Sequence, residues 1–250
     1  MATNLSDIGF AAQSGDELET LARKCYENGR ATRCAKGIYI RWQLSQGIEL
    51  WAQLSLSEEL VGLNPHFGGT ARASLGLTQR VTRSGGFPMD GGFKGLAQPY
   101  GNDPIRGVFA LVFDSPDFHT HDELELPRIA TVQMAAFAQQ CAVFENEEEF
   151  QALATRRGMR LGPDACMAMG LAGADREPLA EPLASALLVG RIQEARQIVN
   201  PFSKHEFWCL RLQNSLGEVD VVADPELLAR PPRAGNVLQS SVLLSGRLVN

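Results

Sequence analysis

The clearest pattern along the chain is an alternation of apolar and polar residues in two neighbouring segments, 38–44 and 48–54. Apolar side chains occupy every second position of both segments, which is the period of a β-strand with one buried face. The residues between them, Ser45-Gln46-Gly47, fit a three-residue turn that ends in a left-handed glycine. The pattern therefore predicts a β-hairpin over residues 38–54.

The second face of this hairpin is amphipathic. Counting outward from the turn places Arg41 opposite Trp51. The same count places Gln43 opposite Glu49. Such a face suits the wall of a binding cleft, and the solvated face of an antiparallel sheet, the simpler reading, would have nearly the same composition. The candidate ligand-binding residues come from this face and from the turn that follows: Tyr39, Arg41, Glu49, Trp51 and His66.

A helix precedes the hairpin. Ser14 and Glu17 have the spacing of a capping box, in which each side chain satisfies a backbone amide of the first turn. Apolar residues then recur at helical spacing up to Tyr26, and Asn28-Gly29 ends the helix, since glycine adopts the left-handed conformation that follows many helices. The short apolar segment at 8–12 predicts a buried strand ahead of the helix.

Downstream of the hairpin the pattern is less regular. Residues 129–144 have the period-two stretches of a strand, while the run MAAFAQQCA within them also suits a buried helix, so both assignments stay open. The other elements expected here are strands at 60–63, 71–83 and 107–113, a turn at 64–69, a glycine-rich loop at 84–95 and a short helix at 145–156.

Residues 172–182 carry alternating charges and two prolines, which is typical of a linker. Beyond them Asp224 and Pro225 can begin a single helical turn. Alternating segments predict four strands in this part of the chain, at 187–199, 205–213, 218–223 and 237–248. Their order resembles a small barrel of the oligonucleotide/oligosaccharide-binding (OB) type, one strand short.

These elements define an α+β fold class in which most of the sheet is antiparallel. We expect an α+β domain at residues 1–170, a linker at 171–184 and a small β-barrel-like domain at 185–250.

Composition and charge narrow the range of partners. The 250 residues carry a net charge of −6 without a basic run, which argues against binding nucleic acid through its phosphates. Apolar segments are shorter than the ~20 residues that cross a bilayer, and the N-terminus lacks the order of a signal peptide. The five cysteines are scattered, which argues against a zinc ribbon or a disulfide framework. We expect a cytoplasmic protein without a cofactor and without membrane contact.

The order strand, helix and three strands over residues 8–63 resembles the βαβββ module of the vicinal-oxygen-chelate superfamily, which includes glyoxalases and ring-cleaving dioxygenases. The resemblance implies a cleft on the sheet and, in metal-bearing members, a metal ligand on the first strand with a glutamate on a later one. Glu49 and His66 are the candidates for a metal site, whereas residues 8–12 hold no His, Asp or Glu. Metal-free members of the superfamily bind small molecules or proteins.

His119-Thr-His121 with Glu125 is the sharpest local match to a metal site. Histidines two apart on a strand share a face, and the spacing resembles half of the first cupin motif. The chain has Phe113 where cupins have a glycine, and it lacks their second motif. His119 and His121 are therefore metal candidates, with solvated loop histidines as the alternative.

The sequence favours a binding protein over an enzyme, because it contains neither a Gly-x-Ser-x-Gly elbow nor a phosphate-binding Gly-x-x-x-x-Gly-Lys loop. Its order of motifs looks like that of uncharacterised bacterial proteins, which supplies no activity. We expect non-catalytic binding of a protein partner or a small ligand, and a bacterial toxin-neutralising (immunity-type) role is one form of this. The alternative is a metal-dependent lyase, isomerase or dioxygenase on the chelate-type scaffold.

Overall fold

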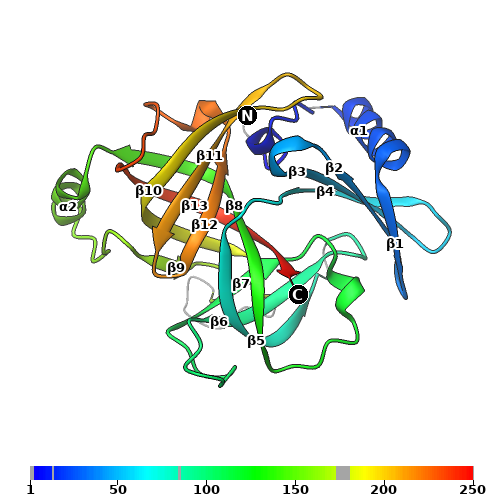
Figure 1. Ribbon diagram of the computed structural model, residues 1–250, viewed down its shortest axis with the longest axis horizontal. Helices are drawn as coiled ribbons and strands as arrows, with labels where there is room; N and C mark the ends of the chain where they lie inside the picture. The colour runs from blue at the N-terminus through cyan, green and yellow to red at the C-terminus, as the bar shows by residue number, and fades with distance from the viewer. Residues whose placement is uncertain (1–2, 13, 84–85, 173–180, 250) are drawn as a thin grey trace.

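The computed structural model describes residues 3–12, 14–83, 86–172 and 181–249. Within these ranges the fold is α+β and mostly β-sheet, with a four-stranded sheet and a nine-stranded sheet. Figure 1 shows the smaller sheet with helix α1 on one side of the molecule and β10–β13 on the other. In the described chain, no helix has the length and apolar character needed to cross a membrane.

The four-stranded sheet confirms the hairpin. Its strands are antiparallel in the order β1-β2-β3-β4, and they follow helix α1 directly. The register of β2 and β3 places Arg41 opposite Trp51 and Gln43 opposite Glu49, as the alternation predicts. The bounds of these elements are α1 Gly15–Asn28, β1 Arg30–Cys34, β2 Gly37–Gln43, β3 Ile48–Leu54 and β4 Leu60–Phe67.

The expected βαβββ order at the N-terminus is wrong. Of the segment expected to be a strand, Ile8 ends a 3₁₀-helix over Ser6–Ile8, Gly9 is left-handed, and residues 10–12 are neither helix nor strand. The side chain of Asn200 donates to the carbonyl of Ile8 at 2.9 Å and takes the place of a neighbouring strand. The order is therefore a helix followed by four strands.

The smaller sheet differs from the sequence-based expectation in two further places, at β1 and at β4, and both differences have local causes. Strand β1 is not predicted from the sequence, because its residues are polar and largely exposed, as is common in an edge strand. Strand β4 runs through the expected turn at 64–69 as far as Phe67, and it tolerates Pro65 because β4 is the other edge of the sheet. The capping box is confirmed by the bond from the Glu17 amide to Ser14, whereas Gly29 is extended and not left-handed.

The nine-stranded sheet contains most of the expected downstream strands, and residues 129–144 belong to a strand, β8. Strand β6 begins within the segment expected to be a glycine-rich loop, so that expectation is wrong for residues 91–95. The glycines of β6 are needed because neighbouring atoms leave no space for a side chain: a Cβ on Gly92 would lie 2.1 Å from the Phe113 carbonyl oxygen. The strands are β5 Arg72–Thr82, β6 Gly91–Ala97, β7 Phe109–Asp114, β8 Arg128–Phe144, β9 Cys166–Ala168, β10 Ser185–Val199, β11 Glu206–Asn214, β12 Gly217–Ala223 and β13 Val237–Val249.

The expected C-terminal small barrel is not found as a separate unit. Strands β10–β13 belong to the same sheet as β5–β8, and β8 and β13 pair along their full overlap from Val237 to Val249. The sheet is also not entirely antiparallel, because β12 runs parallel to β8 and β13 parallel to β7. The division into two domains at residues 171–184 stays a prediction. Residues 173–180 lie outside the described chain, and strands that precede and follow the expected linker belong to one sheet.

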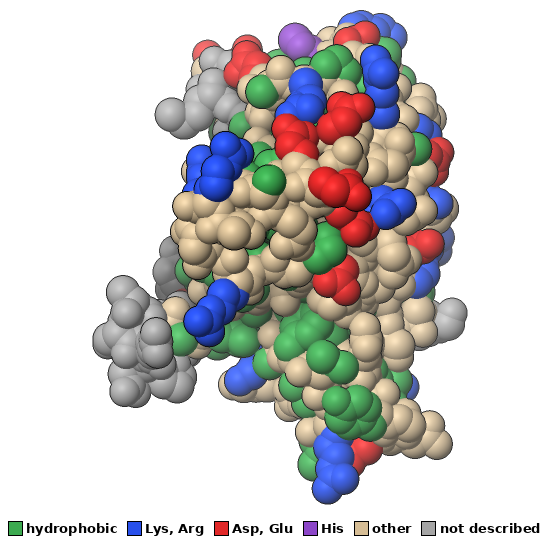
Figure 2. Space-filling view, turned by 90° about the vertical axis from the view of Figure 1, so that its left-hand side faces the viewer, with side chains coloured by type: hydrophobic (Ala, Val, Ile, Leu, Met, Phe, Trp, Pro, Cys, Tyr) green, Lys and Arg blue, Asp and Glu red, His purple; other side chains and the backbone are tan. Residues whose placement is uncertain are grey.

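Helix α2 (Glu147–Arg156) confirms the short helix expected at 145–156. It lies on the outside of the nine-stranded sheet, and Figure 2 looks at the molecule from that side, where acidic and basic side chains lie next to one another. Glu147 pairs with Arg191 at 2.7 Å and Glu149 pairs with Arg230 at 2.9 Å. Exposed pairs of this kind contribute little stability, so this surface is an ordinary solvated one.

Both faces of the smaller sheet are covered. One face packs its apolar residues, among them Ile40 and Leu50, against Phe137 and Phe207 of the larger sheet. On the other face Glu49 and Gln53 are fully buried, so the reading of that face as solvated is wrong for β3. A carboxylate without solvent contact needs compensating partners, and these partners define the candidate site.

Candidate functional site

Glu49 lies at the centre of the site, on β3. One of its carboxylate oxygens accepts a hydrogen bond from the Trp51 indole nitrogen at 3.0 Å. The other forms ion pairs with Arg41, from β2, and with Arg247, from β13, the latter at 3.6 Å. The buried charge is therefore matched by two guanidinium groups that come from different sheets.

Trp51 organises the same two arginines. The guanidinium carbon of Arg247 lies 5.1 Å from the centre of the indole ring, and that of Arg41 lies 5.6 Å from it. A cation at this distance is attracted by the π-electrons of the ring. The indole thus holds both guanidinium groups through its ring and holds Glu49 through its nitrogen.

Arg41, Trp51 and Arg247 open onto one pocket of about 370 Å³. Arg30 of β1 lies on the same pocket and is the direct cross-strand partner of Arg41. Like charges directly opposite each other destabilise a sheet unless something neutralises them. The remaining lining residues are polar: Asn28, Thr32, Gln43, Asp117 and Thr120.

The arginines of this pocket are incompletely neutralised. Within the described chain, Arg30 has no carboxylate within ion-pair distance, and the buried Nε of Arg41 has no hydrogen-bond partner. Three guanidinium groups face two carboxylates, those of Glu49 and Asp117. One positive charge is left over in an otherwise acidic protein.

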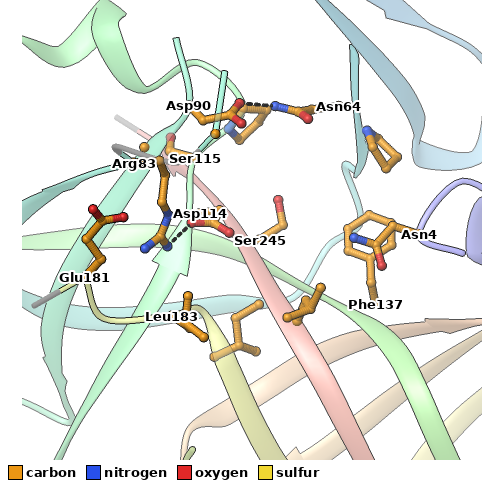
Figure 3. Close-up of a pocket in the computed structure, with 16 residues that line it drawn as sticks. Asn4, Asn64, Arg83, Asp90, Asp114, Ser115, Phe137, Glu181, Leu183 and Ser245 are labelled. Atoms are coloured by element: carbon orange, nitrogen blue, oxygen red, sulfur yellow. Dashed lines mark hydrogen bonds and ion pairs between the residues drawn. The ribbon is translucent and has the colours of Figure 1, made fainter. Parts of the chain in front are cut away.

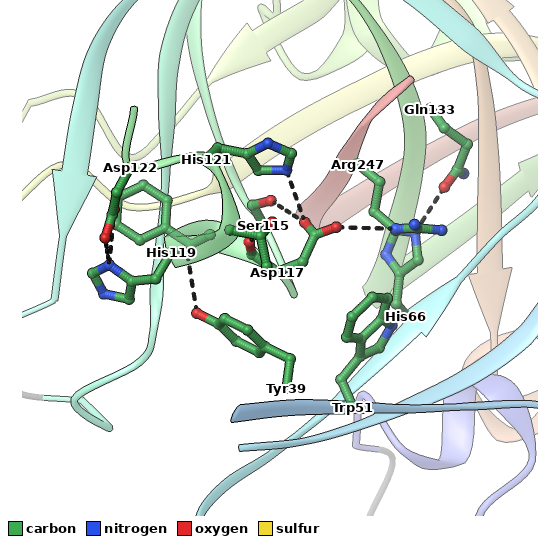
Figure 4. Close-up of polar contacts among 12 residues, drawn as sticks. Tyr39, Trp51, His66, Ser115, Asp117, His119, His121, Asp122, Gln133 and Arg247 are labelled. Atoms are coloured by element: carbon green, nitrogen blue, oxygen red, sulfur yellow. Dashed lines mark hydrogen bonds and ion pairs between the residues drawn. The ribbon is translucent and has the colours of Figure 1, made fainter. Parts of the chain in front are cut away.

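Asp117 lines the pocket beside Arg247. Its carboxylate lies 3.5 Å from Arg247 and 3.5 Å from His121, and it accepts a hydrogen bond from Ser115 at 2.9 Å. Burial raises the pKa of Asp117, but His121, Arg247 and Ser115 together outweigh burial and lower it below its ordinary value. Figure 4 shows these contacts in a row between His121 and Arg247.

Of the ligand candidates, Arg41 and Trp51 line this pocket, whereas Glu49, Tyr39 and His66 do not. The Tyr39 hydroxyl donates to the Met89 carbonyl at 2.8 Å and accepts from the His119 amide at 3.2 Å, so it joins the sheet to the segment after β7. Burial is the main cause that lowers the pKa of His66, although the nearby Glu49 raises it.

The four metal candidates do not converge. Glu49 and His66 are cross-strand partners, but each is bonded to other groups. His119 lies 3.0 Å from Asp122, and His121 contacts Asp117. Among the residues that the structure describes, no group of three or more His, Cys, Asp or Glu side chains could hold a metal ion.

The sequence alone does not identify Arg30, Asp117 and Arg247 as residues of the site. Arg247 carries a signal, because it is the charged residue within the apolar run of the last strand. Arg30 and Asp117 stand in polar segments that look like ordinary surface, and their place at the site follows from the tertiary structure.

Comparisons of the chain with protein-family models, with curated proteins and with solved structures found no match.

Proposed function

We propose that this protein binds a small anionic ligand in the pocket formed by Arg30, Arg41 and Arg247, without transforming it. The observation that carries the proposal is the direct opposition of Arg30 and Arg41 on neighbouring strands that open onto a shared pocket. A bound anion removes the repulsion between them.

The chemistry of the pocket favours a carboxylate or a phosphate. Guanidinium groups bind both through paired hydrogen bonds, and such charge-assisted bonds are stronger than neutral ones. The amide of Gln43 and the hydroxyls of Thr32 and Thr120 add hydrogen-bonding groups around the cations. A pocket of about 370 Å³ has the size of a small-molecule site, which favours a small ligand over a protein partner.

Calorimetric titration with inorganic phosphate, citrate and a neutral sugar tests the proposal. We expect one of the anions to bind and the sugar to give no signal. Arg30→Gln should weaken anion binding by about tenfold or more, because it removes charged hydrogen bonds.

Arg33→Gln is the matched control. Arg33 lies on the same strand, three residues from Arg30 and so on the opposite face, and it pairs with the exposed Glu58. Anion binding should be unchanged in this variant. Equal losses in Arg30→Gln and Arg33→Gln, or no binding of either anion at millimolar concentration, would exclude this pocket as an anion site.

A further inference from the structure

A second cavity, of about 350 Å³, shares no lining residue with the arginine pocket. It is lined by residues from β4, from the β6–β7 region and from β13. Figure 3 shows Ser245 in the middle of the lining residues, with the Arg83–Asp114 ion pair on one side and Asn4 on the other. Ser245 retains 9% of its surface exposed there.

Ser245 is hydrogen-bonded to a histidine that a third side chain orients. The Ser245 hydroxyl lies 2.8 Å from Nδ1 of His66, and Nε2 of His66 lies 2.7 Å from the side-chain oxygen of Gln133. The amide nitrogen of Gln133 donates to the Phe67 carbonyl at 3.0 Å, which fixes the orientation of the amide. Its oxygen therefore accepts, and Figure 4 shows this contact between His66 and Gln133.

The proton positions follow from this chain of contacts. Since the Gln133 oxygen only accepts, Nε2 of His66 carries the proton and donates it. Nδ1 then holds a lone pair and accepts from the Ser245 hydroxyl. His66 is completely buried, so the neutral ring that this pattern requires is also the form that burial favours.

A hydroxyl bonded to a neutral, oriented imidazole and facing a cavity is the arrangement of an activated serine. We propose that Ser245 is a nucleophile, with His66 as its base, that accepts the acyl group of a carboxylic ester bound in this second cavity. This activity goes beyond the proposed anion binding and uses a different site.

The steps balance without any further reagent except water. The Ser245 oxygen forms a bond to the ester carbonyl carbon while its proton passes to Nδ1 of His66. The tetrahedral intermediate expels the alcohol oxygen, which takes that proton from His66. Water then attacks the acyl group on Ser245 while His66 takes a proton from it. As the bond between the acyl carbon and the Ser245 oxygen breaks, His66 returns this proton to that oxygen, and the products are a carboxylic acid and the free serine.

The cavity defines the class of ester. Phe137, Leu243 and Leu244 line it and provide apolar contact for a short acyl chain. Arg83 and Asn64 line it as well. Arg83 pairs with Asp114 and Asn64 donates to Asp90, so their remaining N–H groups are the donors for the oxygen on which negative charge develops. A short-chain acyl ester with an uncharged leaving alcohol fits these surroundings.

The test uses p-nitrophenyl acetate and a fluorophosphonate probe on the full chain. We expect a burst of one equivalent of nitrophenolate, and peptide mass mapping should locate the acetyl or phosphonyl group on Ser245. Ser245→Ala should abolish both signals, and His66→Gln should slow labelling by about a hundredfold or more, because the base is lost. The control Ser241→Ala, on the same strand but outside the cavity, should label at the rate of the original protein.

The pH profile separates a base from a merely structural histidine. Burial lowers the pKa of His66 below 6.5, the ordinary value for histidine; Arg247 lowers it further, while Glu49 and Asp117 raise it. The ring therefore stays neutral, and able to accept a proton, as the pH falls through 6.5. Labelling of Ser245 should persist over that range. Mapping on the original protein gives a result even if a variant fails to fold. Absence of labelling by both reagents, or a label on another residue, would overturn the proposal.

Discussion

The two cavities differ in how they use one shared strand. Arg247 of β13 faces the arginine pocket, and Ser245, two residues before it on the same face, faces the second cavity. Glu49 and His66 are cross-strand partners, and each contacts one of these residues: Glu49 forms an ion pair with Arg247, and His66 is hydrogen-bonded to Ser245. The first cavity is built from permanent charges and the second from a neutral hydrogen-bonded chain, so similar backbone positions support anion attraction in one and nucleophile activation in the other.

The largest expected loss of stability comes from removing the buried charge of Glu49 beside the arginine pocket. Glu49→Gln leaves Arg41 and Arg247 without their common buried partner, and removing one partner of a buried pair costs about 3–5 kcal/mol. Urea denaturation at neutral pH should show a loss of this size. Glu58→Gln removes only the exposed pair with Arg33 and should change the free energy of unfolding by less than about 1 kcal/mol. Similar losses for the two variants would show that Glu49 does not hold the site together.

The next largest loss of stability comes from breaking the hydrogen bond between Ser245 and His66 at the second cavity. Ser245→Ala leaves Nδ1 of His66 buried without a donor, which should cost about 1–3 kcal/mol in the free energy of unfolding. Ser241→Ala is again the comparison. If Ser245→Ala lowered the free energy of unfolding as much as Glu49→Gln does, the distinction between the charged arginine pocket and the neutral second cavity would be lost.

Asp117 should make stability depend on pH in one direction. Its pKa in the folded protein is below the ordinary 3.8, so the stability it contributes is present above that value and is lost as pH falls through the lower, folded pKa. Asp117→Asn should therefore be less stable than the original protein at neutral pH, by on the order of 1 kcal/mol, and the difference should vanish in acid. Chemical denaturation at several pH values measures this; a difference that grows in acid would contradict it.

Asp114, on the rim of the second cavity, should show the opposite sign. Burial raises its pKa above the ordinary 3.8, although Arg83 lowers it. The folded protein then binds the proton more tightly, so stability falls as pH rises from 3.8 through the folded pKa. Asp114→Asn should remove this fall, and the effect should be the smallest of the four because solvent reaches half of the side chain. The same denaturation series decides it, and equal slopes for both aspartate variants would break the comparison.

Local chemistry in the sequence predicted the local structure well. The alternation over 38–54 gave the register of Arg41 with Trp51, because a two-residue period and a short turn leave one pairing that buries the apolar face. The same alternation predicts that Arg41, Glu49 and Trp51 share one face, and the structure brings these side chains together. The strand expected at residues 8–12 is absent, since an apolar segment of that length suits a strand or a buried turn equally.

The rest of the site depends on contacts between distant parts of the chain. Arg30 and Arg247 meet because β1 and β13 belong to different sheets that pack together, and no period in either segment encodes that packing. The hydrogen bonds of His66 likewise join β4 to β8 and β13. A single sequence reports which faces are apolar, but it does not report which faces meet.

The pairing of β8 with β13 has a consequence for synthesis on the ribosome. Because β13 carries both Arg247 and Ser245 and pairs with β7, β8 and β10, neither cavity can be completed until residues 237–249 have emerged. Until then β8 offers an unpaired edge of long, apolar strand, which is the kind of surface that invites aggregation. A nascent chain of this protein should therefore depend on chaperone protection up to the translation of its last strand.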